Sequence, residues 1–194
     1  MRLTMRNLLK FVMVGLVALP GFALIKNTPA EVQPEALAKA TSDVEKKLGS
    51  KLTGDEKIVL EFFMKRGIQD RMALAVLLGN IKQESRFISN ICEGGARVPY
   101  NQCKRGGYGL IQWTTKARYN GLGTHALITG GDPSSLETQL SYLVTEGRWL
   151  AIEHKFKTPG QSMDYYMDAA YYWLGWGVHG NRTLYSHDYY ANLG

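Results

Sequence analysis

Glu84 is the residue of this sequence best placed for acid chemistry, because it is the last acidic residue of an apolar segment predicted to be helical over 70–85. A helix C-terminus carries partial negative charge, which disfavours a carboxylate and raises its pKa. Partial burial raises the pKa further. A carboxylic acid that keeps its proton near neutral pH can protonate the leaving oxygen of a glycosidic bond. The competing interpretation is a solvated helix-end glutamate paired with Lys82 or Arg86.

A second carboxylate is less evident. No Asp or Glu lies between Glu93 and Asp132. Glu93 is the nearest second catalytic candidate, and it would activate a water for inversion if the two carboxyl groups lay about 6.5–9.5 Å apart. Its competing interpretation is a solvated loop acid. Two other outcomes stay open: Asp132 or Glu146 folds into the site, or Glu84 acts alone with a nucleophile that the substrate supplies.

The elements that must position Glu84 begin with a capping-box pattern at 53–56, which predicts a helix ending near Gly67. Asp70 is then an acceptable N-cap for the helix that carries the acid. This helix is apolar on nearly all sides over 72–81, so we expect a buried central helix. Gly79 costs about 1 kcal/mol relative to Ala in a helix interior, and a close helix contact would explain it.

The remaining segments predict an α+β, predominantly helical architecture with a small β-hairpin flanking a cleft. A loop rich in Gly covers 86–107, and the β-forming residues of 108–114 predict a strand or one arm of a hairpin. Further helices are expected over 136–147, 161–175 and 181–193.

The N-terminus resembles an export or anchoring signal. Residues 1–10 carry Arg2, Arg6 and Lys10 with no acid, and 11–25 are free of charge. This pattern is typical of a signal peptide over 1–25, and the run is short for a bilayer span. Small residues permit cleavage after Ala23, while anchoring of the uncleaved segment 8–25 in a membrane is the equal alternative.

Both alternatives place the rest of the chain outside the cytoplasm, in the periplasm or envelope. The expected organisation is the signal, a linker with a possible helix over 26–53, and one catalytic domain over 54–194. Cys92 and Cys103 are the only cysteines, and in an exported protein such a pair most simply forms a disulfide. A metal site is disfavoured because no histidine lies near the pair, and a Cys/His nucleophile is disfavoured because a bridged thiol cannot attack.

Composition narrows the class of partner. The chain has 194 residues with 45% hydrophobic and 21% charged residues, which is typical of a globular protein. Without the basic residues of the N-terminal signal the net charge of +6 falls to about +3, which suits an anionic envelope. The sequence lacks the stripe of basic residues with interleaved aromatics that is typical of nucleic-acid grooves, so nucleic-acid binding is not predicted. Aromatic residues concentrate beyond residue 141, where they would build a core, a sugar-stacking cleft or both.

Two motifs in order resemble a known family. Glu84-Ser-Arg-Phe87 ends the apolar helix, and Gly107-Tyr-Gly-Leu-Ile-Gln-Trp113 follows after a loop. Together they resemble the lysozyme superfamily, closest to the phage tail lysozymes and their goose-type and lytic-transglycosylase relatives. The resemblance covers roughly 55–194, and 182–191 is similar to the family's closing helix.

The resemblance implies roles for single residues. Glu84 would be the general acid, and Ser85 would cap the helix end beside the substrate. Gln112 would contact a sugar amide or orient a water, against the competing interpretation of a surface strand amide. Tyr108 and Trp113 would form subsite walls, because sugar faces pack well against aromatic rings; the alternative for Trp113 is the core.

The function implied is a muramidase that cleaves the β-1,4 bond between N-acetylmuramic acid and N-acetylglucosamine in peptidoglycan. A lytic transglycosylase of the same fold is the near alternative. Tail lysozymes are usually modules of larger virion proteins, so this small chain with an export signal suggests a stand-alone muramidase for phage lysis, a virion-associated one, or one for host wall remodelling. We expect a monomer that needs neither cofactor nor metal.

Two rival interpretations remain. One is a zinc peptidase acting on wall peptides through His154, His179, His187 and Asp188, although no H-E-x-x-H pattern joins them. The other is a non-catalytic envelope-binding protein that keeps the scaffold, because fold does not imply function. The missing second carboxylate makes that rival credible.

Overall fold

The computed structural model describes residues 52–104 and 106–193. The predicted signal over 1–25 and nearly all of the linker over 26–53 lie outside the described residues and stay predictions. Within the described part of the chain, none of the helices has the length and apolar character that crossing a membrane requires.

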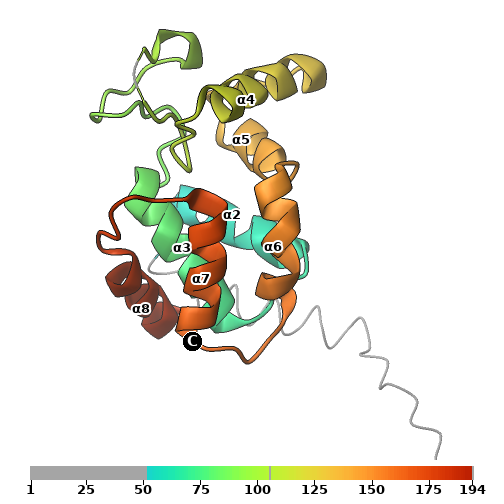
Figure 1. Ribbon diagram of the computed structural model, residues 1–194, viewed down its shortest axis with the longest axis vertical. Coiled ribbons are helices and arrows are strands. Elements are labelled where there is room, and N and C mark those ends of the chain that lie inside the picture. The colour runs from blue at the N-terminus through green and yellow to red at the C-terminus, as the bar shows by residue number, and fades with distance from the viewer. Residues whose placement is uncertain (1–51, 105, 194) are drawn as a thin grey trace, which may run out of the picture.

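The described chain is helical, and its helices are joined by loops of varied length (Figure 1). In chain order the elements are α2 Gly54–Lys65, α3 Arg71–Ser85, the 3₁₀ helix η1 Tyr100–Gln102, α4 Lys116–Thr129, α5 Leu136–Leu143, α6 Gly147–Lys157, α7 Met163–Leu174 and α8 Arg182–Asn192. Figure 1 shows two parts, one with α4 and the long loop before it, the other with α2, α3, α6, α7 and α8.

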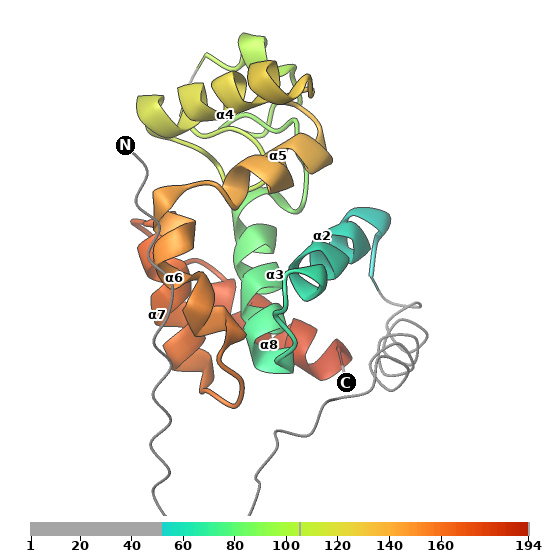
Figure 2. The ribbon, with the colours of Figure 1, turned by 90° about the vertical axis from the view of Figure 1, so that its right-hand side faces the viewer.

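Helix α3 runs through the middle of the second part, with α2, α6, α7 and α8 around it (Figure 2). Asp70 caps its start by accepting a hydrogen bond from the backbone of Ala73 at 2.9 Å. Every residue over 73–81 is buried, because the segment has apolar side chains on all faces and packs against several helices. The predicted buried central helix is thereby confirmed, and so is the capping box at the start of α2.

The most extensive contact of α3 is with the closing helix α8. Gly79 permits it, since a Cβ at position 79 would lie 2.6 Å from the backbone nitrogen of Ser186 on α8. The two helix backbones therefore approach more closely than any side chain would allow. This contact is the physical reason for a glycine inside an otherwise well-formed helix.

The predicted strand over 108–114 does not form. The described residues contain only two isolated antiparallel bridges, Ile91 with Arg97 and Cys92 with Tyr108. Past Tyr108 the chain turns twice through left-handed backbone, at Gly109 with φ 72° and at Gln112 with φ 50°. Such residues interrupt the extended backbone that a strand requires. The segment is a folded turn that the β-forming composition did not reveal.

The later helices differ partly from expectation. Helices α7 and α8 lie where the sequence predicts them, and Ser135 caps α5. The predicted helix over 136–147 instead stops at Leu143, and α6 begins after the N-cap Glu146. Helices α4 and α6 were not predicted, and α4 carries two interior glycines that argue against a helix from sequence alone.

The aromatic residues beyond 141 build both a core and a surface. Trp149 and Trp173 are fully buried, with their rings 5.0 Å apart, and Phe63 packs on Trp149. Trp176, by contrast, is only partly buried, in the loop between α7 and α8. Five of these rings are buried, whereas Trp176 is the partly buried tryptophan among them and Tyr171 and Tyr172 are exposed.

Candidate active site

Helix α3 ends at Ser85, directly after Glu84. The chain leaves the helix through two consecutive left-handed residues, Arg86 with φ 53° and Phe87 with φ 65°. Ser85 stabilises this exit, because its hydroxyl accepts a hydrogen bond from the Phe87 backbone at 3.1 Å. Phe87 then turns into the core. The abrupt end leaves Glu84 on the last turn, where the helix dipole disfavours a carboxylate.

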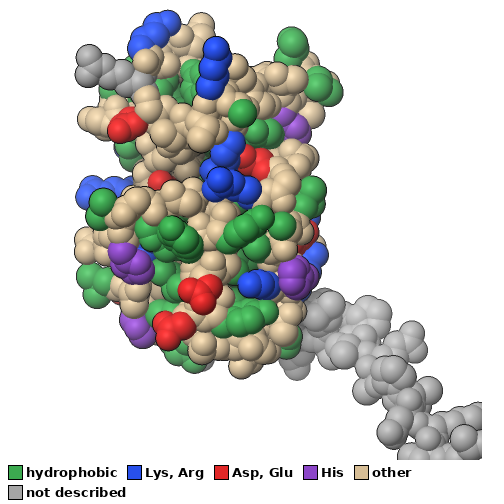
Figure 3. Space-filling model, viewed as in Figure 1, with side chains coloured by type: hydrophobic (Ala, Val, Ile, Leu, Met, Phe, Trp, Pro, Cys, Tyr) green, Lys and Arg blue, Asp and Glu red, His purple; other side chains and the backbone are tan. Residues whose placement is uncertain are grey.

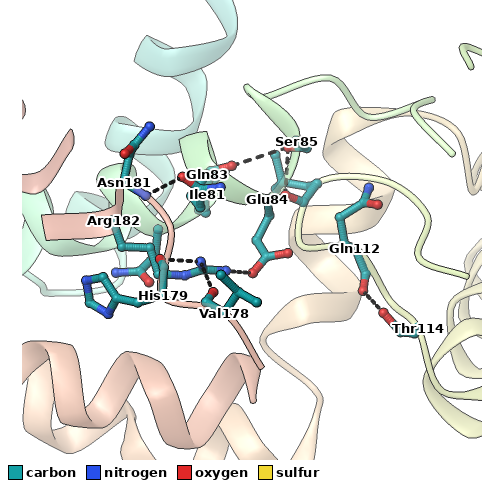
Figure 4. Close-up of polar contacts among 12 residues, drawn as sticks. Ile81, Gln83, Glu84, Ser85, Gln112, Thr114, Val178, His179, Asn181 and Arg182 are labelled. Atoms are coloured by element: carbon teal, nitrogen blue, oxygen red, sulfur yellow. Dashed lines mark hydrogen bonds and ion pairs between the residues drawn. The ribbon is translucent and has the colours of Figure 1, made fainter. Parts of the chain in front are cut away.

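Glu84 forms an ion pair with Arg182, the first residue of α8 (Figure 4). The Glu84 side chain is 15% exposed and that of Arg182 4%. Burial raises the pKa of Glu84 above 4.5, although Arg182 acts in the opposite direction through its charge and hydrogen bond, and Arg118 does so through its charge. The desolvation of the carboxylate therefore outweighs the two cations.

The guanidinium of Arg182 is fixed from several sides. It donates hydrogen bonds to the carbonyl oxygens of Val178 at 3.2 Å and His179 at 2.8 Å. Its carbon lies 4.4 Å from the centre of the Trp176 ring, a cation–π contact. The cation facing Glu84 is thus held by the loop between α7 and α8.

That loop is itself tied to α3. Gln83, next to the acid, accepts a hydrogen bond from the Asn181 backbone at 2.8 Å. Gly180 turns the chain there with φ 61°, and a Cβ at this position would lie 2.7 Å from the Gln83 side chain. Two neighbouring residues of α3 therefore contact this region: Gln83 holds the loop, and Glu84 binds the Arg182 guanidinium.

On the other side, Ser85 and Gln139 hold the turn over 108–113. The Ser85 hydroxyl donates to the Leu110 carbonyl at 2.7 Å, and the buried Gln139 side chain accepts from the Leu110 backbone nitrogen at 2.7 Å. Gln139 also donates to the carbonyls of Ser89 and Pro133. The turn is therefore fixed to the end of α3 and to α5 by side chains that do not line the cleft.

Gln112 lies on this turn, and in Figure 4 its side-chain amide points away from the Glu84 carboxylate. Its side-chain nitrogen donates to the Gly109 carbonyl at 2.9 Å, which orients the amide. Its backbone carbonyl accepts a hydrogen bond from Thr114 at 2.8 Å. Gln112 thus presents a fixed amide rather than the surface strand amide of the competing interpretation.

Glu84, Gln112 and Arg182 line a cleft of about 560 Å³. One wall comes from the 111–118 segment, and the other from Arg148, the end of α7 and the loop that follows it. The lining residues are Glu84, Ile111, Gln112, Thr114, Thr115, Arg118, Arg148, Leu174, Gly175, Trp176, Gly177, Val178 and Arg182. Of the sequence-predicted site residues, Glu84 and Gln112 meet in this cleft.

Tyr108 and Trp113, the expected subsite walls, do not line the cleft. Both are fully buried. The Tyr108 hydroxyl hydrogen-bonds Ser134 at 2.9 Å, and the Trp113 ring nitrogen donates to Glu146 at 3.1 Å. They shape the turn from behind, and the tryptophan that does line the cleft is Trp176. Ser85 is likewise buried and holds the backbone.

The other carboxylates considered from the sequence are occupied or distant from the cleft. Glu93 accepts a hydrogen bond from the Gly107 backbone at 2.9 Å and does not line the cleft. Asp132 lines a separate, smaller pocket. Glu146 is buried and binds Arg118 through both oxygens, at 2.6 and 2.8 Å, besides Trp113. Among the described residues, Glu84 is the one acid in the cleft lining.

Two further expectations concern the cysteines and histidines. The predicted disulfide between Cys92 and Cys103 is present, with their Cα atoms 5.5 Å apart. Residues 52–104 and 106–193 contain no group of three or more His, Cys, Asp or Glu side chains suited to holding a metal ion. His179 hydrogen-bonds Thr183 at 2.8 Å.

No pattern in the sequence marks the three arginines or the tryptophan of the cleft as site residues. Arg182, Arg118 and Arg148 are far apart in the chain, and no periodic pattern marks them. The signal for Arg182 was its position at the start of the closing helix. Trp176 belongs to the aromatic cluster beyond 141, and the glycines on either side of it were the one local sign that it lies in a loop rather than in the core.

Comparisons with known proteins place the chain in a family. Neither the curated proteins nor the solved structures gave a significant match. A scan against family profiles matched residues 55–190 to the one described as phage tail lysozyme, which covers more than half of the chain and includes every cleft residue. The chain, with its single-acid cleft between α3, the 108–113 turn and α8, belongs to the phage tail lysozyme family.

Proposed function

We propose that this protein cleaves the β-1,4 bond between N-acetylmuramic acid and N-acetylglucosamine in peptidoglycan, with Glu84 as the general acid. The proposal refines the lysozyme-like, peptidoglycan-degrading function that family membership gives. The observation that carries it is the Glu84 carboxylate, which lines the cleft, is largely desolvated and has a pKa raised by burial.

The two oxygens of Glu84 take different roles. Oε1 pairs with Arg182, and no described residue hydrogen-bonds Oε2, so Oε2 carries the proton. That proton moves to the glycosidic oxygen as the bond to C1 breaks, and the leaving sugar departs as an alcohol. Arg182 stabilises the carboxylate that this step creates. The same cation therefore opposes protonation of the free enzyme and favours the proton transfer.

Two cleft residues would bind the sugar rings. The Gln112 amide is oriented by its bond to Gly109, which leaves its oxygen to accept from an acetamido N–H. Trp176 offers a partly exposed aromatic ring for the CH face of a sugar. Both would lower the KM by positioning the scissile bond near Glu84.

A lytic transglycosylase reaction is the second candidate, and one observation favours it. Glu84 is the single acid lining the cleft in the described chain, so no carboxylate is at hand to activate a water. In this reaction the C6 hydroxyl of the muramic acid attacks C1 and its proton passes to Glu84, which yields a 1,6-anhydro end. Glu93 would have to leave its bond to Gly107 to serve hydrolysis.

Digestion of purified peptidoglycan, with mass spectrometry of the fragments, tests both candidates. We expect Glu84→Gln to lower the rate by about 10²–10⁴-fold, the range for loss of a general acid. Glu93→Gln is the matched control and should retain most of the activity. Reducing ends would identify hydrolysis, and 1,6-anhydro ends transglycosylation. A Glu84→Gln variant as active as the wild type would refute the proposed acid.

A further inference from the structure

Three of the described arginines line the cleft, and the guanidinium groups of two of them are held by other groups of the protein. Arg118 is bound through two hydrogen bonds by the buried Glu146, and Arg182 is paired with Glu84. Figure 3 shows basic side chains gathered beside acidic ones midway along this face of the molecule. The hydrogen-bond donors of these two guanidinium groups are therefore largely engaged within the protein, whether Glu84 is protonated or ionised.

Arg148 is the third arginine, and its charge is not cancelled. It is exposed on the first turn of α6, and no described residue forms an ion pair or hydrogen bond with it. Its guanidinium lies against the turn that ends α7, since a Cβ at Gly175 would come within 2.9 Å of Arg148 Nη1. A glycine there, with φ 71°, leaves the space that the guanidinium occupies on the cleft wall.

An uncompensated guanidinium in a sugar-binding cleft favours an anionic ligand. An uncharged glycan would gain only hydrogen bonds to neutral oxygens from it, whereas peptidoglycan also carries carboxylates on the lactyl group of muramic acid and on the stem peptide. Arginine binds carboxylates through two parallel hydrogen bonds, and these are stronger than neutral ones. We propose that Arg148 binds a substrate carboxylate and thereby selects carboxylate-bearing glycan strands; this inference rests on the proposed function.

The contribution belongs to binding rather than to bond cleavage. The guanidinium is anchored on the α7 side of the cleft, and the proton transfer needs only Glu84 and its partner Arg182. An interaction of equal strength in the enzyme–substrate complex and in the transition state lowers KM and leaves kcat unchanged. We therefore expect Arg148→Gln to raise the KM about five- to tenfold on carboxylate-bearing strands, the scale of a partly solvated charged hydrogen bond.

The experiment compares the wild type, Arg148→Gln and Arg148→Lys on native strands and on strands whose carboxylates are methyl-esterified. Arg97→Gln is the matched control, because Arg97 is an exposed arginine outside the cleft lining. The loss in Arg148→Gln should disappear on esterified strands, and Arg148→Lys should show a smaller loss on native strands. An equal loss on both kinds of strand, or a loss no larger than that of Arg97→Gln, would overturn the proposal.

Strands stripped of their stem peptides identify the source of the carboxylate. A persistent effect of Arg148→Gln on stripped strands assigns the lactyl carboxylate, and an effect confined to peptide-bearing strands assigns the stem peptide; both support the inference. Binding is also measured directly, by fluorescence anisotropy of labelled strands. If the wild type cleaves nothing, the proposed function fails, while the anisotropy difference between Arg148→Gln and Arg97→Gln still decides the role of Arg148.

Discussion

At the scale of single residues, the site depends on two opposed effects at Glu84. Burial raises the pKa of the carboxyl group, and the cation of Arg182 lowers it. A glutamate with desolvation alone would hold its proton strongly and transfer it poorly, whereas one with a solvated cationic partner would be ionised at neutral pH. In the proposed mechanism, the balance between them sets the upper pH at which the enzyme works.

Replacing Arg182 should therefore shift the pH profile in a defined direction. In Arg182→Gln the cation is lost and desolvation remains, so the pKa of Glu84 rises further. Since activity needs the protonated acid, the fall in kcat/KM on the alkaline side should move to higher pH. The maximal rate should fall about tenfold or more, because the carboxylate formed in the reaction loses its partner.

The control for this measurement is Arg182→Lys, which keeps the positive charge and should leave the alkaline limb closer to that of the wild type. Circular dichroism of all three proteins monitors folding, because the guanidinium also binds the carbonyls of Val178 and His179. An alkaline limb that stays in place in a folded Arg182→Gln variant, or moves to lower pH, would contradict the electrostatic account.

At the scale of elements, secondary structure was predictable where the local sequence pattern suits the tertiary contacts that the segment makes. The central helix α3 was predictable because its continuous apolar run suits a helix surrounded by others. Glu84 was predictable with it, as the acid at the end of that run. The turn over 108–113 was not, because Gln112 adopts a left-handed backbone that its side-chain type does not favour, supported by contacts with Ser85 and Gln139 from distant parts of the chain.

Helix α4 was likewise not predictable from its local sequence. Its interior Gly121 and Gly123 argue against a helix, yet each fits beneath a tyrosine of another segment: a Cβ at Gly121 would meet the Tyr142 hydroxyl, and one at Gly123 would lie 2.7 Å from the Tyr100 hydroxyl. The glycines serve tertiary packing at the expense of helix propensity. Such long-range requirements leave no local signal, which is also why the cleft arginines were not found.

Gly79→Ala tests the closest helix contact. Alanine gains about 1 kcal/mol in helix propensity, but its Cβ would overlap the Ser186 backbone of α8, and overpacking of this kind costs about 1–3 kcal/mol or more. We expect a lower free energy of unfolding, measured by urea denaturation. Gly54→Ala is the control, since nothing lies within 4 Å of a Cβ there and φ is ordinary; it should be neutral or stabilising. A stable Gly79→Ala variant would show that α8 packs less tightly than described.

At the scale of the whole molecule, the disulfide closes a loop within the long segment between α3 and α4, which has no α-helix among its described residues. Cys92 and Cys103 are 11 positions apart, and they enclose the loop that leads into the turn beside the cleft. Closing a loop of this length reduces the entropy of the unfolded chain, with a contribution of up to about 3 kcal/mol. The bond also agrees with the proposed location outside the cytoplasm, where disulfides persist.

Replacing both cysteines by serine should lower the Tm by several degrees, since a loss of 1 kcal/mol shifts the Tm of a domain of this size by roughly 2–4 °C. Thermal denaturation with and without reductant checks the cause. The wild type should lose stability in reductant, and the Cys92→Ser/Cys103→Ser variant should not respond. A wild type equally stable in both conditions would show that the loop is held by its other contacts.

The ion pair between α3 and α8 has a consequence for biosynthesis. Arg182 is encoded 98 positions after Glu84, so a ribosome that has already released α3 has still not produced the partner of the proposed acid. A nascent chain therefore presents an ordinary glutamate at an uncovered helix end. An activity directed at the cell wall is assembled only when the closing helix has been translated and has docked.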